Sequence, residues 1–456
     1  MKYVKRYLEK VNGVSHTTLN PNTPGSIRIH LVPPTKPKLG IPWVIIINGQ
    51  DILPVSCGWG ILLREFINEV NKYAGSSLTD EQITDVIDKA ILEVEHVFIK
   101  TKRSMLRSDL SDLITTLVEL SEGRAPSTES GFMRLKDYGK YMNAPHRMDL
   151  MVSSMYKNNH WHCNQKCIHC YAGDQEQAIK EELTTEQWKS IIDKCKEALI
   201  PQITFTGGEP TLRSDLVELI EYSQWFVTRL NTNGVLLTKQ LCDELYQASL
   251  DNVQVTLYSL NDKIHNLLVG ANNFDKTIEG IKNAIEANLS VSVNTPLCTI
   301  NKDYLTLVKY LHQKCNIKYF TCSGLIVTGN AVNDNSQNTQ LTKEELVSIL
   351  TETMEYIKEK DLSLNFTSPG WVDEQTLQKL GLTLPSCGAC LSNMAIAPNG
   401  DVVPCQSWLS DGSLGNLLND KWDDIWKTKK CKQIRKASMK IDNICPLTNK
   451  NKKEGK

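Results

Sequence analysis

Three cysteines lie close together in the stretch CNQKCIHCYAG, residues 163–173. Cys163, Cys167 and Cys170 have the spacing C-x3-C-x2-C, and an aromatic residue, Tyr171, follows at once. Three thiolates can bind three irons of a [4Fe–4S] cluster, whose last iron needs a fourth ligand. Because no fourth cysteine lies nearby, that iron would keep an open coordination position, which is what catalysis requires.

A structural zinc site is the alternative use of the same stretch. Zinc usually takes its cysteines as two pairs, so a run of three fits poorly. His162 and His169 could complete such a site. Because lone loop histidines are usually solvated, we expect neither of them to bind a metal.

A glycine-bearing turn follows the next predicted strand. The segment TFTGGEP occupies 204–210, and its adjacent Gly207 and Gly208 would let the backbone approach a ligand closely. Alone, such a segment is more typical of a tight strand-to-helix turn. Together, the cysteine trio and GGEP resemble the radical S-adenosylmethionine (SAM) superfamily, whose signature is C-x3-C-x2-C followed by an aromatic residue. The resemblance covers about residues 147–345.

The resemblance implies a role for each matched residue. The three cysteines would hold the cluster, and Tyr171 would pack near the adenine of SAM. Gly207, Gly208 and Glu209 would contact the amino group of its methionine moiety. Three further SAM contacts are implied: Asn233 in the TNG segment, Ser259 after the fourth strand and Asn294 at the end of the fifth strand.

One contact typical of the family is missing. Asp262 and His265 match a D-x-x-H pattern that is often followed by an arginine–glycine pair. Here that pair reads Val269–Gly270. The arginine often helps to hold the methionine carboxylate, so this contact is lost here or supplied elsewhere.

The resemblance also implies the chemistry. The open iron would bind the amine and carboxylate of SAM, and one electron from a donor such as a flavodoxin or ferredoxin would break the sulfonium C–S bond. The resulting 5′-deoxyadenosyl radical would abstract hydrogen from the substrate. The protein would position these groups and exclude water.

A second cysteine group lies in the C-terminal part of the chain. Cys387, Gly400 and Cys405 fit the C-x9–15-G-x4-C opening of the SPASM and twitch extensions found on radical SAM enzymes. The later cysteines of the full SPASM pattern are missing, so the resemblance is to the twitch type with one auxiliary iron–sulfur cluster. It implies four ligands, with Cys431 as the alternate for Cys390 and a zinc site as the alternative: Cys387, Cys390, Cys405 and Cys445.

The remaining six cysteines are scattered. Free cysteine is among the most buried residue types, so we expect small buried hydrophobes at these positions. Cys298 and Cys322 lie near strand ends, where either could also face the substrate. The six are Cys57, Cys195, Cys242, Cys298, Cys315 and Cys322.

Composition sets the broad class. The chain has 456 residues, which predicts two or three domains. Its net charge of −1 gives no attraction to nucleic acid or to an anionic membrane. The longest apolar run, near residues 43–47, is too short to span a bilayer, and the N-terminus lacks the apolar core of a secretion signal. A cytoplasmic enzyme without nucleic-acid or membrane partners is therefore expected.

The first 125 residues predict a small α+β module. Strands are expected at 26–32, 41–47 and 50–55, with a hairpin turn at Asn48–Gly49. Three amphipathic helices follow, the second behind the capping box Thr79…Gln82. The pattern somewhat resembles the winged-helix PqqD-like module that binds the leader of a precursor peptide, and an uncommitted packing domain is the alternative.

The middle of the chain positions the chemistry. Six predicted strands alternate with helices, which means a parallel sheet whose ligands bind at the carboxyl ends of its strands. We expect an α/β partial (β/α)6 barrel of the radical SAM type over 147–345, a linker over 126–146 before it, and a loop-rich iron–sulfur domain over 346–456 after it. The strands are expected at 148–154, 202–207, 226–232, 252–259, 291–297 and 319–327.

The leading functional hypothesis follows from the whole pattern. It is a radical SAM enzyme that places a crosslink, a thioether or an epimer in a ribosomally made peptide. A second hypothesis is action on a protein side chain, as in sulfatase maturation, or on a small metabolite. A third is a non-catalytic iron–sulfur or zinc sensor, which would have no need of a SAM pocket.

Overall fold

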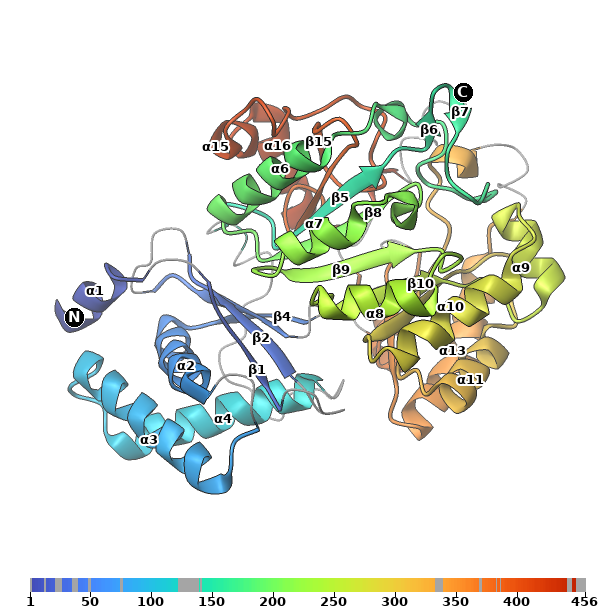
Figure 1. The fold of residues 1–456 in the computed structure, drawn as a ribbon. Coiled ribbons are helices and arrows are strands. Elements are labelled where there is room, and N and C mark those ends of the chain that lie inside the picture. Colours follow the sequence, from blue (N-terminus) through green and yellow to red (C-terminus); the bar gives the residue numbers. More distant parts are fainter. Residues whose placement is uncertain are drawn as a thin grey trace. The chain divides into compact units, whose positions relative to one another are not determined.

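The computed structural model divides into two compact units, residues 1–144 and 145–456 (Figure 1). It describes residues 2–11, 14–20, 27–34, 40–47, 51–73, 77–121, 139, 142–332, 339–368, 371–382, 384–385, 387–440 and 445–447. The predicted turn at Asn48–Gly49 and most of the predicted linker lie outside these residues. The unit boundary falls within that linker.

The first unit is an antiparallel sheet with helices. Its four strands run in the order β1 (Ser15–Leu19), β2 (Ile27–Val32), β3 (Trp43–Ile47) and β4 (Asp51–Val55). The three predicted strands are present, but the prediction missed β1, whose sequence SHTTL has little apolar alternation. It also missed a short helix, α1 (Lys2–Leu8).

The three helices predicted for this unit are all present. They are α2 (Cys57–Val70), α3 (Asp80–Val97) and α4 (Arg103–Ser121). The capping box forms as expected, with Thr79 and Gln82 each bonding the other's backbone N–H. The apolar faces of the helices pack on β2 and β3, so this unit has a core of its own.

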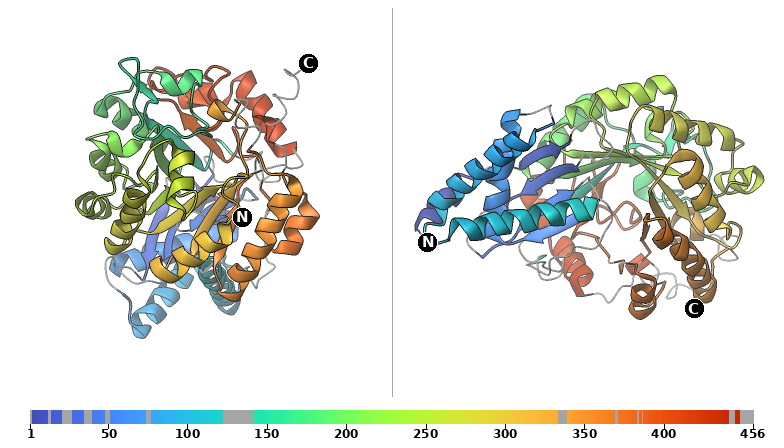
Figure 2. Two further views of the ribbon diagram at one scale, coloured as in Figure 1. Left: turned by 90° about the vertical axis from the view of Figure 1, so that its right-hand side faces the viewer. Right: turned by 90° about the horizontal axis from the view of Figure 1, so that it is seen from below.

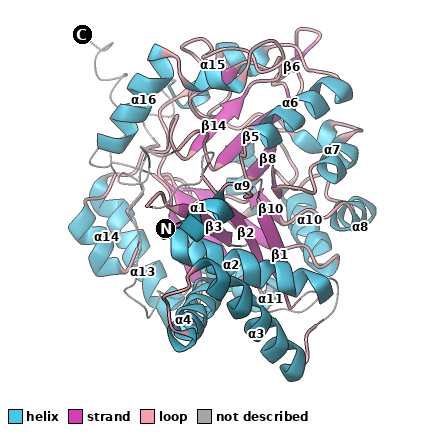
Figure 3. Ribbon diagram, turned by 90° about the vertical axis from the view of Figure 1, so that its left-hand side faces the viewer, coloured by secondary structure: helices cyan, strands magenta, loops and turns pink. Residues whose placement is uncertain are grey.

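The second unit is built on one large sheet. All six predicted strands form. They are parallel to one another and lie side by side in the order in which they occur in the sequence (Figures 2 and 3). The sheet order is β13-β12-β11-β10-β9-β8-β5-β14-β15, an open and partial barrel. The six strands are β5 (Arg147–Ser153), β8 (Gln202–Gly207), β9 (Val227–Thr232), β10 (Asn252–Thr256), β11 (Val291–Pro296) and β12 (Tyr319–Ser323).

Helices connect these strands and cover one face of the sheet (Figure 2). The capping box Thr184…Gln187 starts the first of them. Their apolar sides meet strand residues such as Phe205 and Val255, which are fully buried. The helices are α6 (Thr185–Glu197), α7 (Leu216–Tyr222), α8 (Lys239–Gln247), α9 (Asp262–Val269), α10 (Phe274–Glu286), α11 (Tyr304–Cys315) and α13 (Lys343–Glu359).

The sheet continues beyond the six strands on both sides. After α13, β13 (Ser363–Phe366) pairs in parallel with β12, so the sheet extends past residue 345. On the other side, β14 (Asn393–Ile396) pairs in parallel with β5 and turns back into β15 (Val402–Val403). Gly400, with φ at +89°, lies in the turn between these two strands. The C-terminal cysteine segment is thus joined to the strand that precedes the first cysteine group.

The described part of this unit contains three further helices: α14 (Glu374–Leu380), α15 (Trp422–Trp426) and α16 (Lys429–Lys440). Among the residues that the structure describes, none of the helices is long and apolar enough to cross a membrane.

Candidate active site

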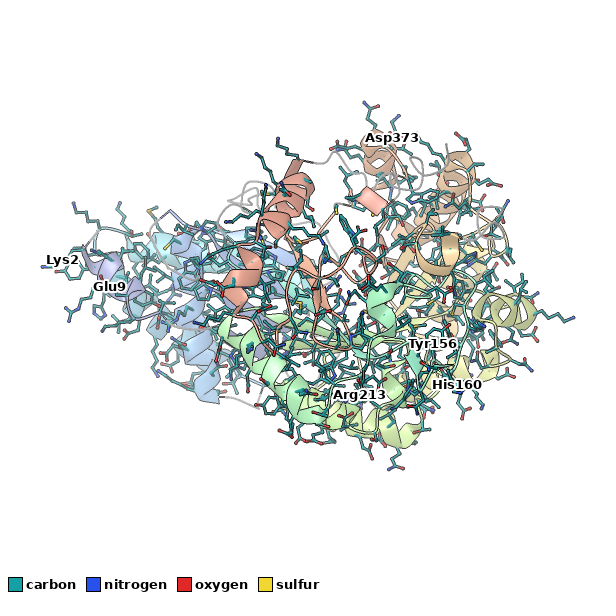
Figure 4. All side chains as sticks on the ribbon, turned by 90° about the horizontal axis from the view of Figure 1, so that it is seen from above. Lys2, Glu9, Tyr156, His160, Arg213 and Asp373 are labelled. Carbon is teal, nitrogen blue, oxygen red and sulfur yellow. The ribbon has the colours of Figure 1, made fainter. Side chains whose placement is uncertain are left out.

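The first cysteine group lies on a loop beyond the carboxyl end of β5. A small hairpin, β6 (Tyr156–Lys157) and β7 (His160–Trp161), leads into it, and Figure 4 labels Tyr156 and His160 there. The Trp161 indole Nε1–H donates to the Gln165 carbonyl at 2.8 Å, which closes the first turn of the loop. The loop then docks on the end of α9.

The docking on α9 explains the Val269–Gly270 pair. The Val269 carbonyl accepts from the Lys166 N–H at 2.9 Å, and the Leu268 carbonyl accepts from the Ile168 N–H at 3.0 Å. Gly270 ends the helix with φ at +62°, and a Cβ there would lie 2.4 Å from the Lys166 carbonyl oxygen. The Val269–Gly270 pair therefore holds the cysteine loop against the C-terminal end of α9.

A second support was missed by sequence reasoning. The Asn330 side-chain amide donates to the Cys167 carbonyl at 3.0 Å, and its backbone N–H donates to the Cys170 carbonyl at 2.9 Å. The preceding Gly329, with φ at +60°, lies so close that a Cβ would meet the Cys170 and Tyr171 carbonyls at 2.4 Å. Glycine followed by asparagine after β12 is the only signal that the sequence offers.

The three thiols of the loop are close neighbours. Burial raises the pKa of the Cys167 thiol well above its ordinary value, and the nearby Cys170 and Cys163 raise it further. Burial and the Glu209 carboxylate raise the pKa of Cys163 to about 12. Thiols crowded in this way lose their protons readily only to a bound cation, so this donor set fits a thiolate-ligated iron cluster.

Among the described residues, no three His, Cys, Asp or Glu side chains are placed so that they could bind one metal ion together.

The expectation that His169 is solvated is wrong. It is 8% exposed, and its Nε2 lies 2.8 Å from the Thr339 hydroxyl, because the loop folds back under Asn330. His162 is half-buried, 3.7 Å from a Glu182 carboxylate oxygen.

The two glycines of the GGEP segment pack against the end of β5. Gly207 has φ at +141°, and a Cβ on it would lie 2.3 Å from the Ser153 carbonyl oxygen. The Gly208 N–H donates to the same carbonyl at 2.8 Å. Only glycine fits this approach, and it brings the backbone of the segment beside the strand that leads to the cysteine loop.

The Glu209 carboxylate is 1% exposed and joins the ends of β8 and β9. It accepts from the Thr211 hydroxyl at 2.6 Å, the Thr232 hydroxyl at 2.7 Å and the Asn233 N–H at 2.8 Å. Burial raises its pKa, and these hydrogen bonds oppose the rise. With its oxygens occupied in this way, Glu209 mainly fixes the shape of the segment.

Asn233 connects that segment to the cysteine loop. Its side-chain amide donates to the Asn164 Oδ1 at 2.6 Å, next to Cys163. Its own Oδ1 accepts from the Val235 N–H at 3.0 Å. The structure thus brings together the cysteine trio, Gly207 to Glu209 and Asn233 at one end of the sheet.

Tyr171 lies between the two cysteine groups. Burial raises the pKa of the Tyr171 hydroxyl, and the nearby thiols of Cys170 and Cys405 raise it further. Gln175 bridges the two parts, because its amide donates to the Tyr171 carbonyl and, at 3.2 Å, to the Ser407 carbonyl. Its Oε1 accepts from the Leu409 N–H at 3.0 Å.

Two further predicted SAM contacts follow or lie on the next two strands, β10 and β11. The Ser259 hydroxyl accepts from the Asn261 N–H at 3.0 Å, in the turn before α9. Asn294 lies in β11 between Thr256 and Thr321, on the face turned away from the helices. His265 is fully buried, and burial lowers its pKa to about 4, so it is a neutral core residue.

The face of the sheet that carries Asn294 is lined with polar side chains. Across it, the Gln254 amide donates to the Thr321 hydroxyl at 3.4 Å. Deeper along the strands, Arg147 pairs with Asp149 at 2.9 Å. Burial, together with Arg147, lowers the pKa of the neighbouring Arg229 to about 10. This face can therefore hydrogen-bond a polar substrate.

The five C-terminal cysteines form one group. The β14–β15 hairpin brings Cys390 to Cys405, since the Cys390 N–H donates to the Pro404 carbonyl at 3.1 Å. The thiol of Cys390 also contacts that of Cys431, and this contact raises the pKa of Cys390. Burial raises the pKa of Cys405 to about 12, and the thiols of Cys387 and Cys445 raise it too. The set fits an iron–sulfur cluster with four thiolates and one cysteine to spare.

The spare cysteine can be identified by iron content. Cys390 and Cys431 touch, so we expect only one of them to bind iron. Of the variants Cys390→Ala and Cys431→Ala, one should keep about eight irons per chain and the other about four. Iron analysis with EPR on anaerobically reconstituted protein checks this. Equal loss in both variants would contradict a four-thiolate cluster with one spare ligand.

The six scattered cysteines are buried, as expected from their isolation. Cys298 packs in a cluster with Tyr258 and Leu268. Burial raises the pKa of the Cys322 thiol to about 12, and the neighbouring Tyr304 hydroxyl opposes the rise.

Family comparisons agree with both cysteine groups. Residues 162–311 match the model of the radical SAM superfamily, and residues 387–447 match the SPASM iron–sulfur cluster-binding domain. The first range contains the cysteine loop through β11, and the second contains all five C-terminal cysteines.

Three similar proteins illustrate the range of relatives. An AdoMet-dependent heme synthase of Oleidesulfovibrio alaskensis is 27% identical over 300 residues, 62% of this chain and 76% of that protein. The mycofactocin maturase MftC of Mycolicibacterium smegmatis is 27% identical over 274 residues, 58% of this chain and 67% of MftC. The crystal structure of Streptococcus suis SuiB bound to precursor peptide SuiA is similar in fold, with a TM-score of 0.58 at 15% identity, covering 90% of this chain and 93% of SuiB.

Proposed function

We propose that this chain, a radical SAM superfamily enzyme with a C-terminal SPASM iron–sulfur domain, modifies a ribosomally made precursor peptide. The observation that carries the proposal is the fold likeness to peptide-bound SuiB, which covers 90% of this chain. The likeness to MftC, a mycofactocin maturase, supports the same reaction class. The product would be a crosslink, a thioether or an epimer, formed in the cytoplasm.

The residues of the site would divide the work as follows. Cys163, Cys167 and Cys170 would hold the SAM-binding cluster, which with SAM supplies a 5′-deoxyadenosyl radical for hydrogen abstraction. The backbone at Gly207 and Gly208 would meet the amino group of SAM, with Glu209 fixing that turn. Tyr171 and Asn233 would border the nucleoside. The polar face of the sheet would receive the substrate residue.

The auxiliary cluster would be held by Cys387, Cys405 and Cys445 with either Cys390 or Cys431. Its full set of thiolates leaves no open position for SAM, so its role would be electron transfer. A flavodoxin or ferredoxin would supply the electrons.

The first unit would recognise the leader of the precursor peptide by strand addition. Strand addition needs an edge strand, so the strand with Ile27 and Ile29 cannot serve, because β2 is an inner strand between β1 and β3. The edge available on that side is β1. The Asn71 amide donates to the His16 carbonyl at 2.9 Å, so that carbonyl points away from β2. In an antiparallel pair of strands, the backbone N–H and C=O groups of every second residue face the same side of the strand. The N–H of Thr18, two residues after His16, therefore also points away from β2.

The test is anaerobic incubation with each candidate short peptide encoded near the gene, followed by mass spectrometry. A loss of two hydrogen atoms per event would indicate a crosslink or thioether, and deuterium uptake from D2O without other mass change would indicate an epimer. The variant Thr18→Pro removes the outward N–H, so we expect leader affinity to fall by about tenfold or more, measured by fluorescence anisotropy.

Thr18→Ala is the matched control, because it keeps the N–H. Both variants should retain SAM cleavage, which does not involve this unit, and an unchanged melting temperature confirms that the unit stays folded. Equal leader affinity in both variants would remove β1 from the proposal. If no peptide is bound or modified, the proposal of a peptide substrate fails.

A second candidate is favoured by the heme synthase relative, which acts on a small molecule and aligns over 300 residues. In that case the polar face of the sheet would hold a metabolite, and SAM cleavage would respond to small molecules and not to peptides. Modification of the encoded peptide would exclude this candidate.

A further inference from the structure

Helix α16 has one face turned toward the auxiliary cysteines. The Arg435 guanidinium donates to the Cys431 sulfur at 3.6 Å and lies 3.7 Å from the centre of the Trp426 ring. The Ser438 hydroxyl donates to the Ala389 carbonyl at 2.8 Å, and its oxygen lies 3.7 Å from the Cys387 sulfur. This face of the helix therefore forms part of the wall around the auxiliary cysteine group.

The opposite face of the same helix is strongly basic. Segment 427–440 contains seven Lys and Arg residues and no Asp or Glu, although the whole chain has a net charge of −1. A shallow hollow of about 340 Å³ lies on its outer side, and Figure 4 shows nitrogen-tipped side chains projecting from this helix. We call its lining residues the lysine face: Lys427, Lys429, Lys432, Gln433 and Lys436.

Helix stability does not explain the lysine face. Lys429, Lys432 and Lys436 follow one another at i+3 and i+4, where like charges repel. Lys429 also lies in the first turn, which favours acidic residues and here has none. Of the lysines on this face, Lys427 pairs with Asp423, and no carboxylate of the described residues pairs with the other three. An arrangement that lowers stability and leaves cations exposed is typical of a surface for an acidic partner.

We propose that the lysine face docks a small acidic one-electron carrier protein, which passes its electron to the auxiliary cluster. The electron would cross the thickness of one helix, about 10 Å, between the carrier and the auxiliary cluster. In this step the reduced carrier loses one electron and the auxiliary cluster gains it, and no bond is made or broken and no proton is transferred. This inference rests on the SPASM cysteine group and does not depend on the identity of the substrate.

The structure also offers a continuation toward the SAM site. Ser407, two residues beyond Cys405, accepts from the Gln175 amide at 3.2 Å, and the same amide donates to the carbonyl of Tyr171. Tyr171 follows Cys170 directly. A short path of covalent and hydrogen bonds thus joins a cysteine of each group, and an electron received at α16 has a route inward.

The test uses the reconstituted full-length protein and a flavodoxin as the acidic carrier. The variant carries Lys429→Glu, Lys432→Glu and Lys436→Glu, and helix α16 should stay folded because glutamate suits its first turn. A matched control reverses three exposed lysines on the outside of the barrel: Lys239→Glu, Lys276→Glu and Lys282→Glu. Both variants change the net charge equally.

We expect carrier affinity, measured by calorimetry at low salt, to fall by about tenfold or more in the α16 variant and much less in the control. In the α16 variant, carrier affinity should also depend less on salt concentration. In stopped-flow experiments without any peptide, reduction of the auxiliary cluster by the carrier should slow to the same degree, while reduction by dithionite stays unchanged.

Three outcomes would overturn the proposal. These are equal losses of carrier affinity in the two triple variants, unchanged carrier affinity in both, and a loss of binding to anionic vesicles in the α16 variant with its carrier affinity unaffected. All readouts are taken without substrate. A failure of the peptide proposal therefore leaves this test intact, and a failure here leaves the peptide proposal intact.

Discussion

Replacing any one of Cys163, Cys167 and Cys170 by alanine abolishes cleavage of SAM under dithionite and lowers the iron content from about eight to about four per chain. The reason is that a cluster with one open iron needs all three thiolates of the loop. Contacts from Asn330 and Gly270 hold the loop in place. HPLC detection of 5′-deoxyadenosine and iron analysis measure the two effects.

The control is a cysteine variant outside both groups. Cys195 is fully buried in α6, and Cys195→Ala should lower stability without lowering iron content or SAM cleavage. In the three loop variants the auxiliary cluster should persist, with its EPR signal unchanged. SAM cleavage at the native rate by a Cys167→Ala protein would show that this loop is not the site.

The strands and helices of the barrel were predictable because local pattern and final structure agree there. The segment at 202–207 is β8 to the residue, since QITFTG is a short apolar run closed by glycine and bounded by Pro201. The start of α6 is also marked by a local signal, the capping box that Thr184 forms with Gln187.

The missed elements depend on contacts between distant parts of the chain. Strand β1 is polar, and it is a strand because it pairs with β2 over Ser15↔Leu31 to Leu19↔Ile27. Strands β13 and β14 are short, and each is recognisable only by its partner, β12 or β5. Local sequence carries no record of these partners.

In the candidate site, too, some residues were predictable from local sequence and others depend on contacts with distant parts of the chain. Its cysteines and glycines could be found from sequence because their types and spacings are dictated by chemistry. The residues that hold them in place could not, since Asn330 and Gln175 are ordinary polar residues until folding brings them to the loop. His169 was misjudged for this reason, because its burial depends on the segment around Thr339.

Replacing Gly207 by alanine should weaken SAM binding by about 100-fold or more while leaving both cysteine groups loaded with iron. Alanine at φ +141° costs about 1–3 kcal/mol of backbone strain, and its Cβ would lie 2.3 Å from the Ser153 carbonyl oxygen. The segment must therefore move away from β5, and the backbone groups offered to SAM move with it. Equilibrium binding of SAM to the oxidised, reconstituted protein measures the effect.

Gly412→Ala is the matched control, because Gly412 also has a positive φ, +69°, but no atom lies within 4 Å of the new Cβ. Both variants carry backbone strain, and only Gly207→Ala carries the collision beside the cysteine loop. A general loss of stability would lower the melting temperature of both and leave SAM affinity similar. If Gly207→Ala binds SAM as tightly as Gly412→Ala does, the GGEP backbone is not part of the SAM site, and the cosubstrate must be held from the other strand ends.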